Sequence, residues 1–503
     1  MDYPFWDVGF GYGILMAIIA IIHVFVSHFA IGGGLYLAVV ESSARKKNDT
    51  LKLEFLKKLS KFFVLVTVVF GALTGVGIWF IIGLVNPAAT EALIHNFVWG
   101  WATEWTFFVI EITAAILYFY GWDRMSAKAH LTVGWIYFGA AWLSLFIING
   151  ILSFMLTPGD WLATGAFWDG FFNPTFFSSL VFRTGICIML AGLYALVVAS
   201  RYKPDENKKK LVRYNTYWAL IGMAIMLPTL YWFVSTIPQN IIDAVWGTDL
   251  TPIASMNASY INFAILALII IVFGLLIPKR YNLAIAIIAM VFGLSYFGEF
   301  EWMRESIRKP YVIYDYMYGN GIWLGDSDKY AKDGLLAHIK VKSGDDNADL
   351  FNHACRSCHT MNGYKALAPH YNGTDVDFIA PTVLGSHMML GNMPEYMGTA
   401  DESRMIATHI YNNIDQRPFT EIYSNLSGVE LGKKVYDIRC GKCHIFGGLN
   451  DKSESILGLS ESDYNDLLDM AGDFADEMPP FTGDAAEREA LIKYLMSLSE
   501  GGN

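Results

Sequence analysis

The chain has 503 residues, of which 54% are hydrophobic and only 17% are charged, and its mean hydropathy is +0.36. A soluble protein carries roughly 25% charged residues, so this composition excludes a single soluble globular enzyme. The part before Met303 is nearly neutral, with 18 basic and 17 acidic residues, whereas the rest is acidic, with 18 basic and 30 acidic residues. The acidic part argues against a nucleic-acid partner, because phosphate binding needs basic patches.

Eight apolar stretches are long enough to cross a membrane, which takes about 20 helical residues. They are Gly9–Val40, Phe62–Val85, Phe97–Tyr120, Leu131–Met155, Phe176–Ala199, Tyr214–Ile237, Tyr260–Ile277 and Asn282–Trp302. The first stretch is not a cleavable signal peptide, because it has no basic start and its apolar run is too long. We therefore expect an eight-helix membrane bundle.

The basic residues between these stretches predict the orientation of the bundle. The first, third, fifth and seventh connections hold seventeen lysines and arginines, and the second, fourth and sixth hold none. Cytoplasmic connections are the ones enriched in lysine and arginine. The N-terminus and everything after the eighth stretch are therefore expected on the outer side of a bacterial cytoplasmic membrane.

Ionisable side chains inside the apolar stretches are costly, and they predict either function or internal pairing. The set is His23, His28, Glu104, Glu111, Arg183, Glu299 and Glu301. His23 and His28 are five helical residues apart and cannot share a face, whereas Glu104 and Glu111 are seven apart and can. These groups either pair with one another to hold the bundle together or surround a buried cofactor. Their number and their position in the outer half favour the cofactor.

Two Cys-x-x-Cys-His motifs lie in the acidic part, at Cys355-Arg-Ser-Cys358-His359 and Cys440-Gly-Lys-Cys443-His444. This motif attaches haem covalently: two thioethers hold the porphyrin, and the histidine is the proximal iron ligand. A redox dithiol or half of a zinc site is the alternative, but each motif follows a short amphipathic helix, as in a cytochrome. Haem is attached outside the cytoplasmic membrane, which agrees with the predicted orientation. Two covalent c haems are expected.

The distal iron ligand of the second motif is predicted from the segment Glu477-Met478-Pro479-Pro480-Phe481, which precedes a helix expected from Asp484 to Leu498. This arrangement resembles a class I cytochrome c, with Met478 as the distal ligand. A core-packing role is the alternative for Met478. Methionine and histidine together would raise the reduction potential relative to two histidines.

The distal ligand of the first motif is less well defined. Met393 precedes a proline and best matches the Met-Pro pattern, while His370 and His387 compete with it. Other methionines follow nearby, namely Met388, Met389 and Met397. The backbone of the segment Ala380–Gly385 is expected to orient His359.

The predicted fold class is all-α. A polytopic helix bundle of residues 1–310 is expected to precede two small α-helical cytochrome c domains, residues 311–425 and residues 426–503.

The membrane part resembles subunit I of cytochrome bd-type oxidases over about Phe10 to Tyr311. The resemblance rests on the run from His23 to Glu41, on Gly121-Trp122-Asp123-Arg124 after the third stretch, and on Arg308-Lys309-Pro310 after the eighth. It implies that His23 is an axial ligand in a high-spin haem pair, hence at least one non-covalent haem b or d.

The same resemblance assigns roles to the intramembrane acids. It implies that Glu111 lies on a proton route or near the haems. Glu104 and Glu299 are nearest two further haem-pocket positions, each one residue out of register. We take Glu104, Glu111, Glu299 and Arg183 as candidate catalytic residues. His28 is a further candidate, for a second haem or for a polar bridge.

The chain also departs from this family. The family's low-spin haem b takes a histidine from the fifth helix and a methionine from the seventh, and Arg183 and Leu266 stand at those positions. The long outer loop associated with quinol oxidation is absent, since Pro238 to Met256 is only 19 residues. The ninth helix is replaced by the cytochrome c region.

Three functions fit these observations. The first is a membrane electron-transfer enzyme, for example a terminal oxidase, that is fed through the c haems instead of by quinol. The second reverses the flow, from quinol through the c haems to an outside acceptor. The third is a haem-bearing anchor subunit of a larger respiratory complex. The expected partners are other membrane or periplasmic respiratory subunits, a soluble redox protein, the lipid membrane and, for the second function, quinone.

Overall fold

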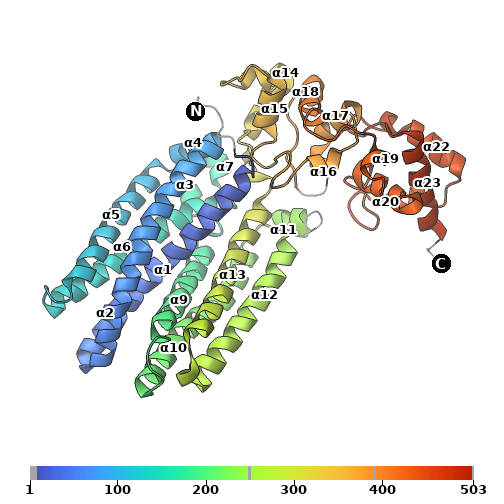
Figure 1. Cartoon of the computed structure of the whole chain (residues 1–503). Coiled ribbons are helices and arrows are strands. Elements are labelled where there is room, and N and C mark those ends of the chain that lie inside the picture. The colour runs from blue at the N-terminus through green and yellow to red at the C-terminus, as the bar shows by residue number, and fades with distance from the viewer. Residues whose placement is uncertain (1–7, 247–250, 390–391, 501–503) are drawn as a thin grey trace.

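The computed structural model describes residues 8–246, 251–389 and 392–500. A long helix bundle carries a smaller helical region at one of its ends, and the chain runs once from the bundle into that region (Figure 1). The all-α expectation is confirmed, with a single two-stranded sheet as the exception in the described part of the chain.

Eight helices in the described residues are long and apolar enough to span a membrane, which confirms the predicted number. They are α1 (Tyr12–Lys47), the continuous α2, η1 and α3 (Thr50–Val64, Leu65–Gly71, Ala72–Val85), α5 (Val98–Gly121), α6 (Ala127–Phe154), α9 (Phe176–Ala199), α10 (Glu206–Ser235), the continuous α12 and η2 (Thr251–Ile269, Ile270–Leu276), and α13 (Leu283–Arg308). The connections hold α4 (Pro87–Asn96), α7 (Trp161–Thr164), α8 (Phe167–Phe171), α11 (Gln239–Trp246) and η3 (Pro278–Arg280).

Several spans begin earlier than the apolar stretches do, because polar residues cap them. The Asp205 carboxylate accepts a hydrogen bond from the Lys208 amide at 2.9 Å, so α10 begins well before the predicted Tyr214. Asp49 and Ser126 cap α2 and α6 in the same way. Such caps satisfy amide groups that have no partner inside the helix.

Helix α9 lies at the centre of the bundle. Of its most apolar window, 67% is buried, against 39% or less in the other spans. Small residues allow the close approach: Gly32 of α1 faces the Cys187 carbonyl, and Gly192 faces the α10 backbone at Ala219, with no room for a Cβ atom at either glycine. This packing, common between membrane helices, places Arg183 of α9 in the interior.

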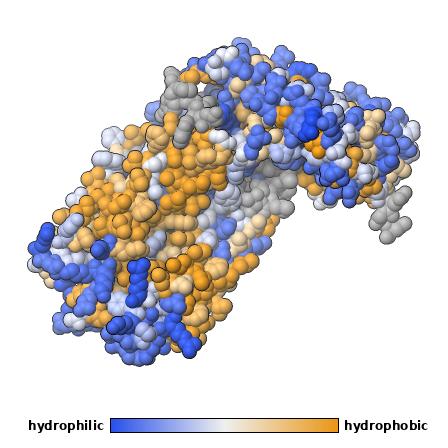
Figure 2. Space-filling model, viewed as in Figure 1, coloured by the Kyte–Doolittle hydropathy of each residue, from blue (hydrophilic) through white to orange (hydrophobic). Residues whose placement is uncertain are grey.

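The two ends of the bundle differ. The basic connections α1–α2, α5–α6, α9–α10 and α12–α13 lie together at one end, which we call the basic end (Figure 1). The N-terminus and the C-terminal region lie at the opposite end, the module end. Figure 2 shows a broad hydrophobic belt between hydrophilic surfaces at both ends, as expected of a protein located in a membrane.

The C-terminal region begins with a short antiparallel hairpin of β1 (Tyr311–Ile313) and β2 (Met317–Tyr318). Two separate hydrophobic cores follow. The first module, residues 322–414, contains η4 (Leu324–Asp326), α14 (Ser327–Asp333), η5 (Leu336–His338), α15 (Asp346–Ala354), α16 (Ala368–Tyr371), α17 (Val376–Leu384), η6 (Ser386–Met388) and α18 (Ala400–Tyr411). The second module, residues 419–496, contains α19 (Phe419–Ile422), α20 (Gly428–Arg439), α21 (Ser453–Ile456), α22 (Glu461–Asp469), η7 (Ala471–Asp473) and α23 (Ala485–Glu500), which extends beyond that core.

Candidate functional site

Both Cys-x-x-Cys-His motifs adopt the same local structure. Each begins at the residue after a helix, since α15 ends at Ala354 and α20 at Arg439. The His359 amide donates to the Cys355 carbonyl at 2.9 Å, and the His444 amide donates to the Cys440 carbonyl at the same distance. This tight turn presents two sulfur atoms and one imidazole on the same side, as haem attachment requires.

The two proximal histidines are oriented in the same way. His359 Nδ1 lies 3.0 Å from the Lys365 carbonyl, and His444 Nδ1 lies 3.1 Å from the Asn450 carbonyl. A carbonyl only accepts, so each Nδ1–H donates and each Nε2 keeps its lone pair for iron. The expectation that Ala380–Gly385 orients His359 is wrong, because the turn after the motif supplies a nearer carbonyl.

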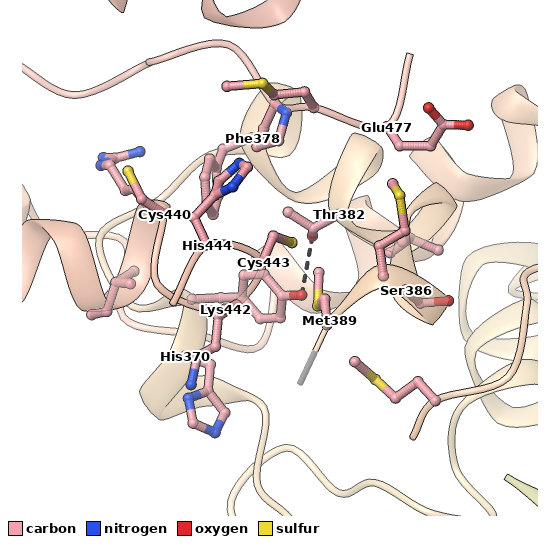
Figure 3. Close-up of a pocket in the computed structure, with 18 of the residues that line it drawn as sticks. His370, Phe378, Thr382, Ser386, Met389, Cys440, Lys442, Cys443, His444 and Glu477 are labelled. Carbon is pink, nitrogen blue, oxygen red and sulfur yellow. Dashed lines mark hydrogen bonds between the residues drawn. The ribbon is translucent and has the colours of Figure 1, made fainter. Parts of the chain in front are cut away.

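One continuous cavity of about 870 Å³ contains both motifs. Its wall includes Cys355, Cys358 and His359 from the first module and Cys440, Cys443 and His444 from the second. Figure 3 shows Cys440, Cys443 and His444 on one side of it and Thr382 and Ser386 of the first module on another. The attachment sulfurs, the free imidazole nitrogens and the mainly apolar wall fit two covalent haems.

The predicted distal ligands are distributed unequally around this cavity. Met478 and Met393 both line it, as does His370, whereas His387 is not among the lining residues. Three further methionines line the cavity near the first motif, namely Met388, Met389 and Met397. Met478 stays the prediction for the second haem, and the choice for the first stays between methionine and His370.

The first module is fixed to the module end of the bundle. The Tyr364 amide donates to the Phe10 carbonyl at 3.0 Å, and the Asn86 side chain donates to the Gly319 carbonyl at 2.8 Å. Asn320, just after the hairpin, donates to the Ala354 carbonyl at 3.1 Å, directly before the first motif. Lys309, at the end of α13, lines the haem cavity itself. The first motif therefore lies between the bundle and the second motif.

His23 has the surroundings of a metal-ligating histidine. Its Nδ1 lies 3.1 Å from the Thr74 hydroxyl, and that hydroxyl donates to the Phe70 carbonyl at 2.6 Å. The Thr74 oxygen therefore accepts from His23 Nδ1–H, and His23 Nε2 keeps its lone pair. Ligating histidines are oriented by such a second hydrogen bond, so His23 fits the role implied for it.

His28 is oriented away from His23, as predicted, and both of its ring nitrogens are engaged. Nδ1 donates to the Val24 carbonyl at 2.8 Å, and Nε2 accepts from Arg183 at 3.3 Å. These contacts make His28 a polar bridge between α1 and α9 in this structure. A role of His28 toward a second haem stays a prediction.

Arg183 pairs with Glu301, another of the seven ionisable residues of the apolar stretches. Its Nη1 lies 2.7 Å from Glu301 Oε1, and only 1% of its surface is exposed. Neither Glu104 nor Glu299 reaches it. Glu299 precedes Glu301 by two residues on α13, which turns its side chain to the opposite side of the helix.

The positions of the family's low-spin haem ligands do not fit a haem. Arg183 is held by Glu301, and a guanidinium has no lone pair for iron. Leu266 is fully buried, and a Cβ atom placed on Gly293 would lie 3.6 Å from it. Side chains of the chain itself fill this part of the bundle.

Glu104 and Glu111 face the same neighbouring helix. Ser144 donates to Glu104 at 2.9 Å, and Tyr137 donates to Glu111 at 3.0 Å, both from α6. Their shared face is thereby confirmed. Their catalytic role stays a prediction.

A charged network continues from Arg183 toward the haem cavity. Arg304 lies 3.1 Å from Glu301, and Lys309 lies 3.1 Å from Glu305, which also pairs with Arg308. These residues occupy successive turns of α13 up to Lys309, whose side chain lines the cavity of the first motif. Paired charges, buried at Arg183 and Glu301 and partly exposed at Glu305 and Lys309, therefore connect the interior of the bundle with the first module.

A further buried cluster of polar side chains, near the basic end, was not predicted from the sequence. The Glu41 carboxylate, fully buried, accepts from Tyr118 at 2.8 Å and from Arg45 at 2.6 Å, and His130 Nδ1 lies 2.8 Å from it. The Trp122 ring of the Gly-Trp-Asp-Arg motif packs against His130. The signal for this cluster was the position of His130 and Glu41, two ionisable residues that each directly adjoin an apolar stretch.

Alanine in place of His444 is expected to remove the proximal ligand of the second c haem, because no other imidazole stands at that turn. The pyridine haemochrome spectrum and the oxidised-minus-reduced spectrum measure the loss.

Met478→Ala should instead keep the haem attached, make its iron high-spin and lower its potential. His409→Ala, which replaces a histidine outside the cavity wall, serves as the control; an equal loss in that variant would contradict the assignment.

Known families match two parts of the chain. Residues 14–243 match the family described as cytochrome bd terminal oxidase subunit I, and residues 428–495 match the family described as cytochrome C oxidase, cbb3-type, subunit III. The first Cys-x-x-Cys-His motif lies outside both ranges. A comparison with curated protein sequences found no match.

Among solved structures, the chain is similar to the bd oxidase from Geobacillus thermodenitrificans, with a TM-score of 0.52 and 16% sequence identity over 60% of this chain and 89% of that chain. This likeness concerns the fold. The family matches imply b- or d-type haem in the bundle and covalent haem c in the second module. The chain thus joins a membrane domain similar to cytochrome bd terminal oxidase subunit I to a C-terminal domain similar to the cbb3-type cytochrome c oxidase subunit III.

Proposed function

We propose that this protein is a respiratory oxidoreductase in which the two c-type modules deliver electrons to the membrane domain, where oxygen is reduced at the His23 site. Haem supplies reversible one-electron chemistry at iron. The residues of the chain hold and orient it: His359 and His444 in the modules, and His23, positioned by Thr74, in the bundle.

The position of the first motif carries this proposal. Hydrogen bonds from Tyr364 to Phe10 and from Asn86 to Gly319 hold the start of the C-terminal region against the module end, and Lys309 at the end of α13 lines the cavity. The second motif opens into the same cavity on the side away from the bundle. A linear order of second module, first module and membrane domain is the order that a relay needs.

The loss of the low-spin haem ligands favours entry of electrons through the two c-type modules. A quinol oxidase of the bd type needs the low-spin haem to receive electrons, and here Arg183 and Leu266 occupy its ligand positions. The segment between α10 and α12 is also short, although residues 247–250 lie outside the described part of the chain. Electron flow in the opposite direction, from quinol through the c haems to an outside acceptor, would need a quinol site unlike that of the bd family.

The proposal requires the modules to lie outside the cytoplasm. All four basic connections gather at the end of the bundle opposite the modules, which favours that orientation. Reporter fusions at Lys209 should therefore be cytoplasmic, and fusions at Ser343 and at the C-terminus should be external. A cytoplasmic Ser343 would contradict both the orientation and the relay.

Haem stoichiometry of the purified full-length protein tests the function. Two c haems and at least one b or d haem that binds carbon monoxide are expected, together with oxygen uptake driven by a reduced dye that donates to c haems. Oxygen uptake with quinol alone, and none with the dye, would support the outward direction and contradict the proposal.

The anchor function is the second candidate, and the ion pair of Arg183 with Glu301 is the observation that favours it. It predicts two c haems and no non-covalent haem in the same stoichiometry measurement.

A further inference from the structure

The wall of the cavity that contains both Cys-x-x-Cys-His motifs includes a hydrogen-bonded pair of hydroxyl groups. Tyr371, the last residue of α16, and Thr382 of α17 both line it, and both belong to the first module. Neither residue is a candidate iron ligand. The inference that follows rests on the proposed relay and concerns how the two haem sites are positioned relative to each other.

The hydroxyl groups of Tyr371 and Thr382 are joined in a defined direction. Their oxygens lie 3.0 Å apart, and the Thr382 oxygen lies 2.6 Å from the Ile379 carbonyl. A carbonyl only accepts, so Thr382 donates to Ile379 and Tyr371 donates to Thr382. The Tyr371 carbonyl in turn accepts from the Thr374 hydroxyl at 2.7 Å. The tyrosine is thus held at both its backbone and its phenol.

Tyr371 lines the cavity together with the cysteines of both attachment sites. Burial raises the pKa of its hydroxyl to about 12. It is therefore a neutral hydroxyl at physiological pH. Figure 3 shows the hydrogen bond of Thr382 beside Cys443 and His444.

Helix α17 is a wall that both modules share. The Arg439 guanidinium of the second module lies 5.3 Å from the centre of the Phe378 ring. Arg439 is fixed in turn by Glu487 at 2.8 Å. At the other end of α17, a Cβ atom on Gly385 would lie 2.9 Å from Glu477 Cβ, next to Met478. The two modules therefore meet closely on both sides of Thr382.

We propose that Tyr371, held by Thr382, is a positioning residue that separates the two c haems and sets their mutual distance and their protection from water. In this role the residue acts on both haems although it belongs to the first module. A residue that merely stabilised the first module would affect the first haem alone.

Spectroelectrochemical titration of the full-length protein tests this proposal, after haemochrome analysis has confirmed that both c haems are attached. Tyr371→Leu removes the ring and should lower the midpoint potentials of both haems, because water reaches both sites. Tyr371→Phe keeps the ring and should give a smaller shift of the same sign. Thr382→Val, which releases the phenol, should resemble Tyr371→Phe. Magnetic interaction between the two ferric haems, measured by pulsed electron paramagnetic resonance, should change in Tyr371→Leu.

Tyr464→Phe is the matched control, because Tyr464 is fully buried in the core of the second module and does not line the cavity. It should leave both potentials unchanged. A shift of the first haem only, or of neither haem, in Tyr371→Leu and Tyr371→Phe would overturn the proposal. These measurements concern only the c haems, so failure of oxygen reduction would contradict the proposed function and leave this result intact.

Discussion

His23→Ala is expected to abolish the absorbance of non-covalent haem and to leave both c-type haem bands in place. In the structure His23 keeps Nε2 free for iron, because Nδ1–H is donated to Thr74. His28 has no such free nitrogen. His28→Ala should therefore only perturb the same absorbance. Optical difference spectra of membranes and of the purified protein provide the measurement.

Thr74→Val tests the same haem site with a milder change than removal of the His23 side chain. It removes the acceptor that orients His23, and the loss of such a second hydrogen bond weakens metal binding on the order of 10–100-fold. Partial loss of non-covalent haem is expected. If the native protein contains only c haems, the assignment of His23 fails and the anchor function replaces the oxidase.

Glu301→Leu is expected to destabilise the bundle more than any other single change in its interior ion pairs. The substitution would leave two guanidinium groups, those of Arg183 and Arg304, without their common carboxylate. Removing one partner of a buried ion pair costs about 3–5 kcal/mol. Arg183→Met should cost less, because Glu301 would still pair with Arg304. Thermal unfolding of the purified protein in detergent gives the comparison.

The double variant Arg183→Met with Glu301→Leu should recover part of the loss, because neither charge of the pair then remains buried alone. Glu206→Gln is the control. It breaks the exposed pair of Glu206 with Lys279, 2.6 Å apart, and exposed pairs contribute about 0–1 kcal/mol. A double variant less stable than Glu301→Leu alone would contradict the pairing.

The elements of the fold that depend on short stretches of chain were predictable. Membrane spans depend on the local density of apolar residues, so all eight stretches correspond to spans in the structure. The two haem attachment motifs depend on five consecutive residues each, and the turn that they form is closed by their own backbone hydrogen bonds.

Some details of the candidate sites depend on neighbours that sequence spacing does not define. Glu299 and Glu301 are equally acidic and two residues apart, but a rotation of about 200° around α13 lets only Glu301 meet Arg183. The acceptor for His359 was placed in Ala380–Gly385, whereas the turn at Lys365 brings a closer carbonyl. The start of α10 differs from the predicted start for a similar reason, because the cap at Asp205 lets the helix begin before its apolar run.

The sequence by itself determined that this chain is a helical membrane protein with basic residues on alternate connections and two Cys-x-x-Cys-His motifs, because hydropathy, charge and such motifs are local properties. Only the tertiary structure decided that both motifs open into one cavity that Tyr371 also lines, and that Arg183 is neutralised by Glu301. These features arise where residues distant in sequence pack against each other, and packing is set by the shapes of whole helices and modules.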